Sequence, residues 1–294
     1  MFIDDLAIQD TAIPQPLRPP GQQVFARRAE RLRSLAHGHA MADFLRCCAD
    51  IAHAQQACHD RLAEQAVNST ACLRDMLTQL HNTLGPVLGD ASHSAVHCLL
   101  AMDDDTLQAL ALTLRAGTAA ANPALQAGLP LLGAALQVQA VISARQRDLS
   151  RLQHSESAHC PVCHAPPVAS LLRRGDSGHA VRYACCSQCA SEWHVTRVKC
   201  LGCGNTRELQ YRSLALHDSE PAAPNHKQPH QHRAVHEAEC CDSCHGELKM
   251  VSTLLDAQAE PFADDLASLM LDMLAGEAGY GRIGVNPYFI AGQA

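Results

Sequence analysis

Four Cys-x-x-Cys pairs are the residues of this chain best suited to chemistry. Each pair places two sulfur atoms on one tight turn, whose backbone N–H groups stabilise thiolate charge. Two such turns complete a tetrahedral metal site with metal–sulfur distances of about 2.3 Å. A single pair would be weak support, because a redox-active thiol pair has the same spacing. Four pairs in one short stretch predict two four-cysteine metal sites, formed by Cys160, Cys163, Cys186, Cys189, Cys200, Cys203, Cys241 and Cys244.

The spacing of the pairs predicts which of them share a metal ion. The second pair begins 23 positions after the first ends, and the fourth begins 38 positions after the third ends. Only 11 positions separate the second pair from the third. We therefore expect the first pair to join the second and the third to join the fourth, with crossed pairing as the alternative. Four thiolates in a tetrahedron suit zinc or a single iron ion, and this geometry does not choose between them.

Residues beside the pairs indicate how the turns close. Gly204 follows the third pair and adopts a positive φ easily. His164 and His245 follow the first and fourth pairs, and we interpret them as turn residues because His tolerates a positive φ better than most residues. Cys185 and Cys240 each directly precede a pair, whose two-residue gap favours the next cysteine as the ligand. We expect both to be small buried residues.

Other cysteines and histidines have a weaker claim to chemistry. Lone cysteines in a helical region are mostly packed or simply tolerated, which is our interpretation of Cys47, Cys48, Cys58, Cys72 and Cys98. A loop at 217–236 contains prolines and is able to bind metal opportunistically. We expect it to be an insertion between ribbon strands, carrying His217, His226, His230, His232 and His236.

The composition of the chain changes at about residue 152. Aromatic residues are only 3% of the chain, so a core drawn from its 47% hydrophobic residues must be mostly Ala, Leu and Val, which favours helices. Residues 1–21 are rich in proline and predict a flexible arm. Residues 22–152 predict a helical domain, with helices at about 24–35, 41–66, 70–84 and 107–117 and two more between 122 and 152.

After residue 152 short β-like segments replace the helices. They lie at 168–172, 180–185, 192–198, 208–214 and 248–254 and predict two small metal-binding modules at 153–198 and 199–260. Pro261 suits the first turn of a last helix at 261–275, within a C-terminal segment of helix and tail at 261–294. The expected buried face of that helix consists of Leu266, Leu269, Met270, Met273 and Leu274. The predicted fold class is multi-domain, with an all-α domain before two small β modules and a C-terminal helix.

Charge and hydropathy limit the classes of function. Between residues 160 and 260 ten Lys and Arg stand against eleven Asp and Glu, which is not the basic surface that nucleic-acid binding needs. The first residues are acidic where a secretory signal needs Lys or Arg. The longest apolar run, 129–142, is broken by Gln137 and Gln139 and is shorter than the roughly 20 residues of a membrane span. We expect a cytoplasmic protein whose cysteines bind metal and do not form disulfides.

The residues around the second and third pairs resemble a known family. Residues 186–203 read Cys-Ser-Gln-Cys-Ala-Ser-Glu-Trp-His-Val-Thr-Arg-Val-Lys-Cys-Leu-Gly-Cys, similar to the central signature of the formate dehydrogenase accessory proteins, the FdhE family. Three further stretches match in order: Ala-Ala-Leu-Gln-Val at 134–138, the last cysteine pair with its flanks at 239–249, and Ala-Asp-Asp-Leu-Ala at 263–267 with the segment that follows to Tyr288. Residues 1–130 carry little of the resemblance.

The resemblance implies a fold and a role. The fold would be a helical domain followed by two rubredoxin-like modules, with iron favoured over zinc as the metal. The role would be that of a cytoplasmic accessory factor, which binds the catalytic subunit of respiratory formate dehydrogenase before export and supports its maturation. His164 and His245 depart from the small residues common at these places in the family.

Five residues outside the pairs are candidates for contact with that partner: Trp193, His194, Arg197, Asp264 and Asp265. For Arg197 and the acidic pair, a role in locking the domains together is considered beside partner contact. The alternative is that Trp193 packs between the two ribbons, Arg197 supports a turn or is simply solvated, and the acidic pair caps a helix or is simply solvated. A homodimer is left open. A rubredoxin-like electron carrier or thiol-redox protein is the alternative function, and we expect no catalytic activity of the chain itself, because no pattern of catalytic residues stands out.

Overall fold

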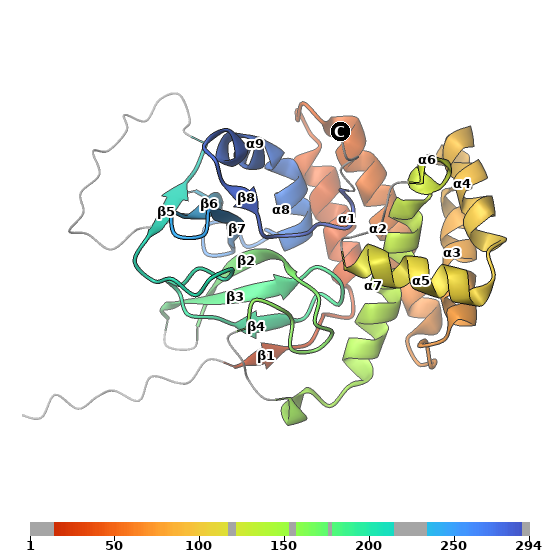
Figure 1. The fold of residues 1–294 in the computed structure, drawn as a ribbon, viewed down its shortest axis with the longest axis horizontal. Helices are drawn as coiled ribbons and strands as arrows, with labels where there is room; N and C mark the ends of the chain where they lie inside the picture. Colours follow the sequence, from red (N-terminus) through yellow and green to blue (C-terminus); the bar gives the residue numbers. More distant parts are fainter. Residues whose placement is uncertain (1–14, 117–121, 153–156, 176–177, 215–233, 290–294) are drawn as a thin grey trace, which may run out of the picture.

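The structure is a computed structural model that describes residues 15–116, 122–152, 157–175, 178–214 and 234–289. A helical part and a sheet-containing part lie side by side (Figure 1). The described helices of the first part are α1 (Val24–Leu35), α2 (Ala42–Leu62), α3 (Thr70–Leu84), α4 (Asp90–Leu100), α5 (Asp104–Arg115), α6 (Pro123–Gln126) and α7 (Leu129–Gln146), with 3₁₀ turns at Gly85–Val87 and Leu149–Arg151. The sequence missed α4, and the other helices lie close to their predicted ranges.

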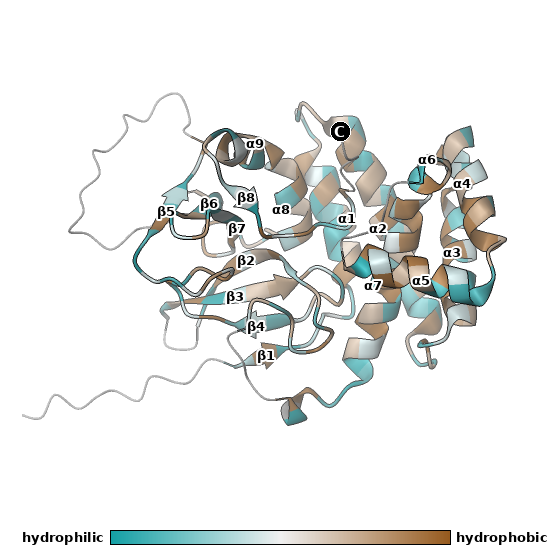
Figure 2. Ribbon diagram, viewed as in Figure 1, coloured by the Kyte–Doolittle hydropathy of each residue, from teal (hydrophilic) through white to brown (hydrophobic). Residues whose placement is uncertain are grey.

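Helix α7 is the central element of the helical part. It packs against α2, α3 and α5, and most of its residues are buried. Figure 2 shows it as apolar over most of its length, as expected for a helix that is enclosed on nearly every side. The two glutamines in its apolar run are buried as well, so each of them needs a hydrogen-bonding partner.

The described strands form one sheet. They are β1 (Leu17–Arg18), β2 (Pro167–Arg174), β3 (Ala180–Cys186), β4 (Glu192–His194), β5 (Leu209–Arg212), β6 (His236–Cys241), β7 (Gly246–Ser252) and β8 (Gly281–Arg282). Their order is β1-β4-β3-β2-β7-β6-β5, and β8 also pairs with β7. Strand β1 falls inside the predicted arm of residues 1–21 and pairs with β4. The sequence also missed β6, whose first residue belongs to the predicted histidine-rich loop.

The sheet contains one structural unit twice. In each unit a cysteine pair precedes a hairpin, β2–β3 or β5–β6, and a second pair follows the hairpin before a third strand, β4 or β7. The two units join where β2 runs parallel to β7, with Ser170 opposite Met250. A single apolar core continues from the helices into β2, because Leu136 of α7 and Leu171 belong to the same buried cluster. The predicted fold class, helices followed by two small β modules, is confirmed.

The predicted last helix is two helices, α8 (Pro261–Ala267) and α9 (Leu269–Glu277). Helix α8 packs between α1 and strands β2 and β7. The break lies at Ser268, where the Lys249 ammonium and the Ser268 backbone N–H both donate to the carbonyl of Asp265. The predicted buried face is therefore largely wrong. Leu266 is buried and Leu269 is half-buried, whereas the exposed residues are Met270, Met273 and Leu274, and the buried residues of α9 are Leu271 and Ala275.

Candidate metal centres

The first two cysteine pairs form one cluster. The Sγ atoms of Cys160 and Cys189 lie 3.6 Å apart, and those of Cys163 and Cys186 lie 3.3 Å apart. All four Sγ atoms lie within 4.8 Å of one another. A tetrahedron with metal–sulfur distances of about 2.3 Å has sulfur–sulfur edges of about 3.8 Å. The cluster therefore fits a metal ion, and Cys163 is its one exposed cysteine.

The third and fourth pairs form the second cluster. Its Sγ–Sγ distances are 3.7 Å for Cys200 and Cys244 and 3.7 Å for Cys203 and Cys241, close to the same tetrahedral edge. Cys203 and Cys244 are both exposed, so this cluster is more open to solvent than the first. The predicted grouping of the pairs is confirmed for both clusters.

All four turns share one backbone geometry. A residue with positive φ follows each pair: His164 (61°), Ala190 (53°), Gly204 (80°) and His245 (55°). Each of these residues donates its backbone N–H to the carbonyl of the first cysteine of its pair, at 2.9 to 3.2 Å. The two histidines are therefore turn residues, as their positions predicted, and the described clusters contain sulfur ligands alone.

The thiols of each cluster differ in acidity. Hydrogen bonds from its three neighbouring cysteines lower the pKa of Cys163, whereas burial raises the pKa of Cys186. In the second cluster the backbone N–H of Asn205 lowers the pKa of Cys203 to about 7, and burial raises that of Cys200 to about 12. A metal ion needs every ligand deprotonated, so its binding must release protons and strengthen as pH rises.

The helical part holds the first cluster in place. Gln137 of α7 donates from Nε2 to the carbonyl of Ser187, which lies between the two cysteines of the second pair, at 2.8 Å. Gln55 of α2 in turn donates to Oε1 of Gln137 at 3.1 Å. Arg147 donates to the carbonyl of Val162, inside the first pair, at 2.6 Å. In the sequence Gln137 stood out as a break in an apolar run and as part of the family-like stretch at 134–138, and neither observation assigned it this role. A buried amide in such a run was the signal for this role.

Arg182 of β3 holds the linker between the two clusters. Arg182 as a whole is only 1% exposed. Its guanidinium donates to the carbonyl of Lys199 at 2.8 Å and pairs with Glu239 of β6 at 3.0 Å. Lys199 directly precedes the first cysteine of the second cluster. One buried side chain therefore fixes the position of the second unit relative to the first. The sequence did not predict this role, since Arg182 belongs to no motif.

The candidate partner residues of the linker lie in different surroundings. Trp193 is fully buried in a cluster that includes cysteines of the first site, and its Nε1 donates to the carbonyl of Ser157 at 3.1 Å. His194 is half-buried and lies edge-on to Tyr183, with 5.9 Å between ring centroids. Arg197 is exposed. Of the three, Trp193 organises the first module, while Arg197 is open to solvent.

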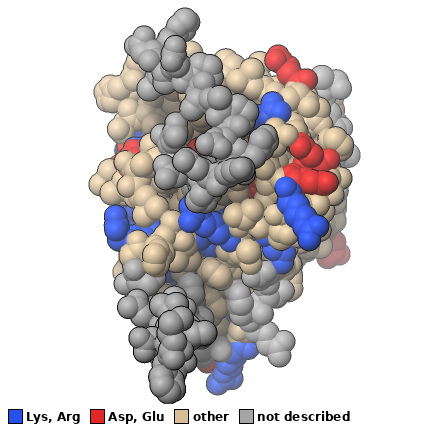
Figure 3. Space-filling model, turned by 90° about the vertical axis from the view of Figure 1, so that its left-hand side faces the viewer, with Lys and Arg blue, Asp and Glu red and all other residues tan. Residues whose placement is uncertain are grey.

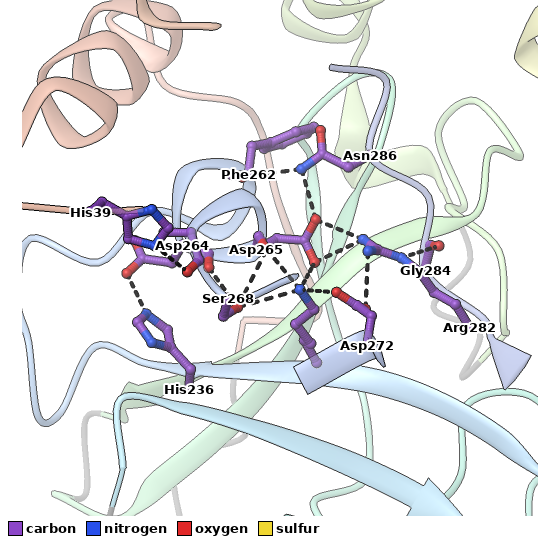
Figure 4. Close-up of polar contacts among 12 residues, drawn as sticks. His39, His236, Phe262, Asp264, Asp265, Ser268, Asp272, Arg282, Gly284 and Asn286 are labelled. Carbon is purple, nitrogen blue, oxygen red and sulfur yellow. Dashed lines mark hydrogen bonds and ion pairs between the residues drawn. The ribbon is translucent and has the colours of Figure 1, made fainter. Parts of the chain in front are cut away.

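The acidic pair of α8 is buried in a network of charges (Figure 4). Asp264 accepts bonds from both Arg31 of α1 and His236 of β6, at 2.6 Å from each. Asp265 pairs with Lys249 of β7 at 3.1 Å and with Arg282 of β8 at 2.6 Å. Both carboxylates are 0% exposed. The pair therefore ties the helical part to the second module through α8.

The remaining cysteines belong to neither cluster. Cys185 and Cys240 are buried. Of the cysteines in the helical part, two are exposed, two are buried and one is half-buried, and none belongs to a group of three metal-ligating side chains among the described residues. His236 opens β6 and contacts Asp264, whereas His217, His226, His230 and His232 lie outside the described residues.

These features define a class of protein in which a helical domain packs against two zinc-ribbon-like units, each with a four-cysteine cluster. The chain belongs to the FdhE family. Family models described as the N-terminal, central and C-terminal domains of FdhE match residues 13–72, 159–197 and 198–289. The resemblance seen in the sequence is thereby confirmed, and it extends to residues 13–72, where it was not visible.

Curated proteins and a solved structure agree with this assignment. An FdhE homolog of Pseudomonas aeruginosa is 36% identical over 307 residues, covering 93% of this chain and 92% of its own. Protein FdhE of Salmonella dublin is 32% identical over 306 residues, covering 96% and 93%. The crystal structure of the FdhE protein from Pseudomonas aeruginosa matches with a TM-score of 0.79 and 32% identity, covering 95% of this chain and all of that one.

None of the described helices is both long enough and apolar enough to cross a membrane.

Proposed function

We propose that this chain is a cytoplasmic accessory protein that binds the catalytic subunit of respiratory formate dehydrogenase and supports its maturation before export. The observation that carries the proposal is the match to FdhE proteins along nearly the whole chain, in sequence and in fold. The chain does not act as an enzyme in this proposal. Its work is recognition of an unfinished partner, and the clusters hold the recognising surface in shape.

The eight clustered cysteines are the proposed ligands of two metal ions. Their sulfur–sulfur distances fit zinc and a single iron ion equally well, so the preference for iron rests on the family resemblance alone. A bound ion would cross-link the two cysteine turns of each unit, and its binding free energy would stabilise the folded unit. A redox-active ion would also make each unit sensitive to oxidation.

The surface charge favours a protein partner over nucleic acid. Basic and acidic side chains stand near one another on the face at the sheet end of the molecule, among many uncharged residues (Figure 3). Nucleic-acid binding instead needs a continuous basic surface. Within this proposal, exposed Arg197 and half-buried His194 remain candidates for direct contact with the partner. Buried Trp193, Asp264 and Asp265 would support that surface from inside.

The proposal is tested by capture and by deletion. The tagged chain, expressed in its own host under conditions that induce formate dehydrogenase, is expected to enrich the catalytic subunit. Deletion of the gene is expected to remove formate dehydrogenase activity while the subunit is still synthesised. Failure to enrich the subunit, together with intact enzyme activity in the deletion strain, would show that the proposal is wrong.

A second candidate function is electron transfer by a rubredoxin-like iron centre. The exposure of Cys203 and Cys244 favours it, because electron transfer needs a cluster near the surface. The helical part and its hydrogen bonds to the first cluster have no role in that function. Reversible one-electron reduction by a physiological partner would support this candidate, and a chain that carries only zinc would remove it.

A further inference from the structure

A cavity of about 780 Å³ lies between α5, α7 and the first cysteine cluster. Its size is that of a typical ligand site. Cys163, the one exposed cysteine of that cluster, forms part of its wall. The cavity therefore joins the helical part to a candidate metal centre, and no role assigned above makes use of it.

Two residues of the wall each carry a buried polar atom that has no hydrogen-bonding partner among the described residues. One is Nε of Arg115, whose other end donates to Gln139 at 2.6 Å. The other is Oε1 of Gln188, a residue that is only 7% exposed. Leaving such atoms unpaired is costly, so an occupant of the cavity toward which these two side chains turn would gain a hydrogen bond from each of them. A peptide backbone offers both partners at each residue, whereas an inorganic anion offers no donor to the Gln188 oxygen.

The charges around the cavity favour an acidic occupant. Arg115, Arg147, His159 and His164 line it, and no described Asp or Glu does. Arg115 interacts with Cys163 and so offsets part of the negative charge that a filled cluster would place there. Arg147, which also donates to the carbonyl of Val162, and the two exposed histidines offer N–H donors to a carboxylate. Leu112 of α5, which is 56% exposed, adds an apolar contact at the edge.

We propose that this cavity is the docking site for an extended acidic segment of the partner protein, which covers Cys163 when it binds. The inference rests on the proposed function, because the partner is taken to be the formate dehydrogenase catalytic subunit. Docking there places the segment against the first cluster. The partner thereby shields the exposed ligand of that cluster from solvent.

Photo-cross-linking tests the location of the site. A benzophenone amino acid replaces Leu112 in the full-length chain, and a second variant carries it in place of Val87, which is 65% exposed and does not line the cavity. Each variant is mixed with the purified catalytic subunit, irradiated and analysed by mass spectrometry. We expect cross-links from position 112 to an acidic segment of the subunit and none from position 87. Cross-links from position 112 to a second copy of this chain would overturn the proposal.

Charge variants at Leu112 test the chemistry of the occupant. Because this side chain is exposed, L112E and L112K should both fold, which circular dichroism verifies. We expect L112E to weaken binding of the subunit by about tenfold and L112K to leave it unchanged or tighter, with V87E as the neutral control. Equal weakening by L112E and L112K would exclude an acidic segment.

The outcomes separate the cavity from the proposed function. The wild-type chain could bind the subunit while L112E binds it equally well and position 112 forms no cross-link to it. In that case docking lies elsewhere and only the cavity proposal fails. If the wild-type chain does not bind the subunit at all, the proposed function fails and this inference fails with it.

Discussion

The guanidinium of Arg182 and the carboxylate of Glu239 form a buried ion pair across the two halves of the sheet, 3.0 Å apart, with side chains 0% and 2% exposed. The pair joins β3 of the first unit to β6 of the second. Tyr211 also donates to Glu239 at 3.1 Å, so the carboxylate sits in a closed polar network. The relative position of the two clusters depends on this network.

Removal of the Arg182 charge should be strongly destabilising. In R182M the Glu239 carboxylate would be buried without its guanidinium, which typically costs about 3–5 kcal/mol in the free energy of unfolding. Urea unfolding of the metal-loaded protein measures the change. R46M is the matched control, because Arg46 pairs with Asp43 on an exposed helix surface and such pairs contribute about 1 kcal/mol or less. Equal effects of the two substitutions would contradict the role assigned to Arg182.

The second cluster should exchange its metal ion faster than the first. Two of its cysteines are exposed, whereas the first cluster exposes only Cys163. A chromogenic chelator added to the anaerobic protein should therefore remove one ion per chain quickly and the other slowly. The double variant C200S/C203S should lack the fast phase, and C160S/C163S should lack the slow one. Loss of the slow phase from C200S/C203S would reverse the assignment.

The Gln137 amide should stabilise the first cluster specifically. Q137M keeps the length of the side chain but leaves the buried carbonyl of Ser187 without its donor, which costs about 1–3 kcal/mol. Q146M is the control, because Gln146 of the same helix also donates to backbone carbonyls but is exposed, and water can replace it. Unfolding experiments and the slow phase of metal release should both change in Q137M and stay the same in Q146M.

Glu247 should make the protein less stable as pH rises. Burial raises the pKa of Glu247 to about 7, and the nearby Asp272 charge acts in the same direction. In the unfolded chain the pKa of this carboxyl is near its ordinary value of about 4.3. Between that pH and about pH 7 the carboxyl is mostly ionised in the unfolded chain but protonated in the folded chain, so the free energy of unfolding falls as pH rises. The stability gained by E247Q over wild type should grow through this range and level off at about 4 kcal/mol.

The quantity to follow is the difference in the free energy of unfolding between E247Q and wild type at each pH. Both E247Q and wild type keep all their cysteines, so proton release on metal binding cancels from the comparison. E30Q, which changes an exposed carboxylate of α1, serves as the control and should show no trend with pH. A stability difference for E247Q that stays constant from pH 5 to pH 8 would contradict the raised pKa.

The clusters were predictable because their geometry is local. A Cys-x-x-Cys turn sets its own backbone, and the positive φ at His164 and His245 follows from the turn itself. The grouping of the pairs followed from the length of chain between them. The interpretation of Cys185 and Cys240 as buried residues rested on the same local spacing.

The parts that the sequence missed depend on contacts between distant residues. Helix α8 ends at Ala267, where Lys249, far away on β7, donates to the carbonyl of Asp265 in the last turn. Beyond that break Met270 of α9 is exposed, although the sequence placed it on the buried face of one continuous helix. The sequence likewise left open whether Asp264 contacts a partner, locks the domains together or caps a helix, and its ion pair with Arg31 of α1 could not be predicted from it. No local pattern contains these partners.

Native mass spectrometry of the tagged chain, captured from its own host without oxygen, tests the central claim most directly. One spectrum reports both the partner and the metal content, and the mass distinguishes zinc from iron. The account predicts a complex with the formate dehydrogenase catalytic subunit in which this chain carries two metal ions, one in each four-cysteine cluster. A chain that carries no metal, or one that carries two ions but never the subunit, would contradict it.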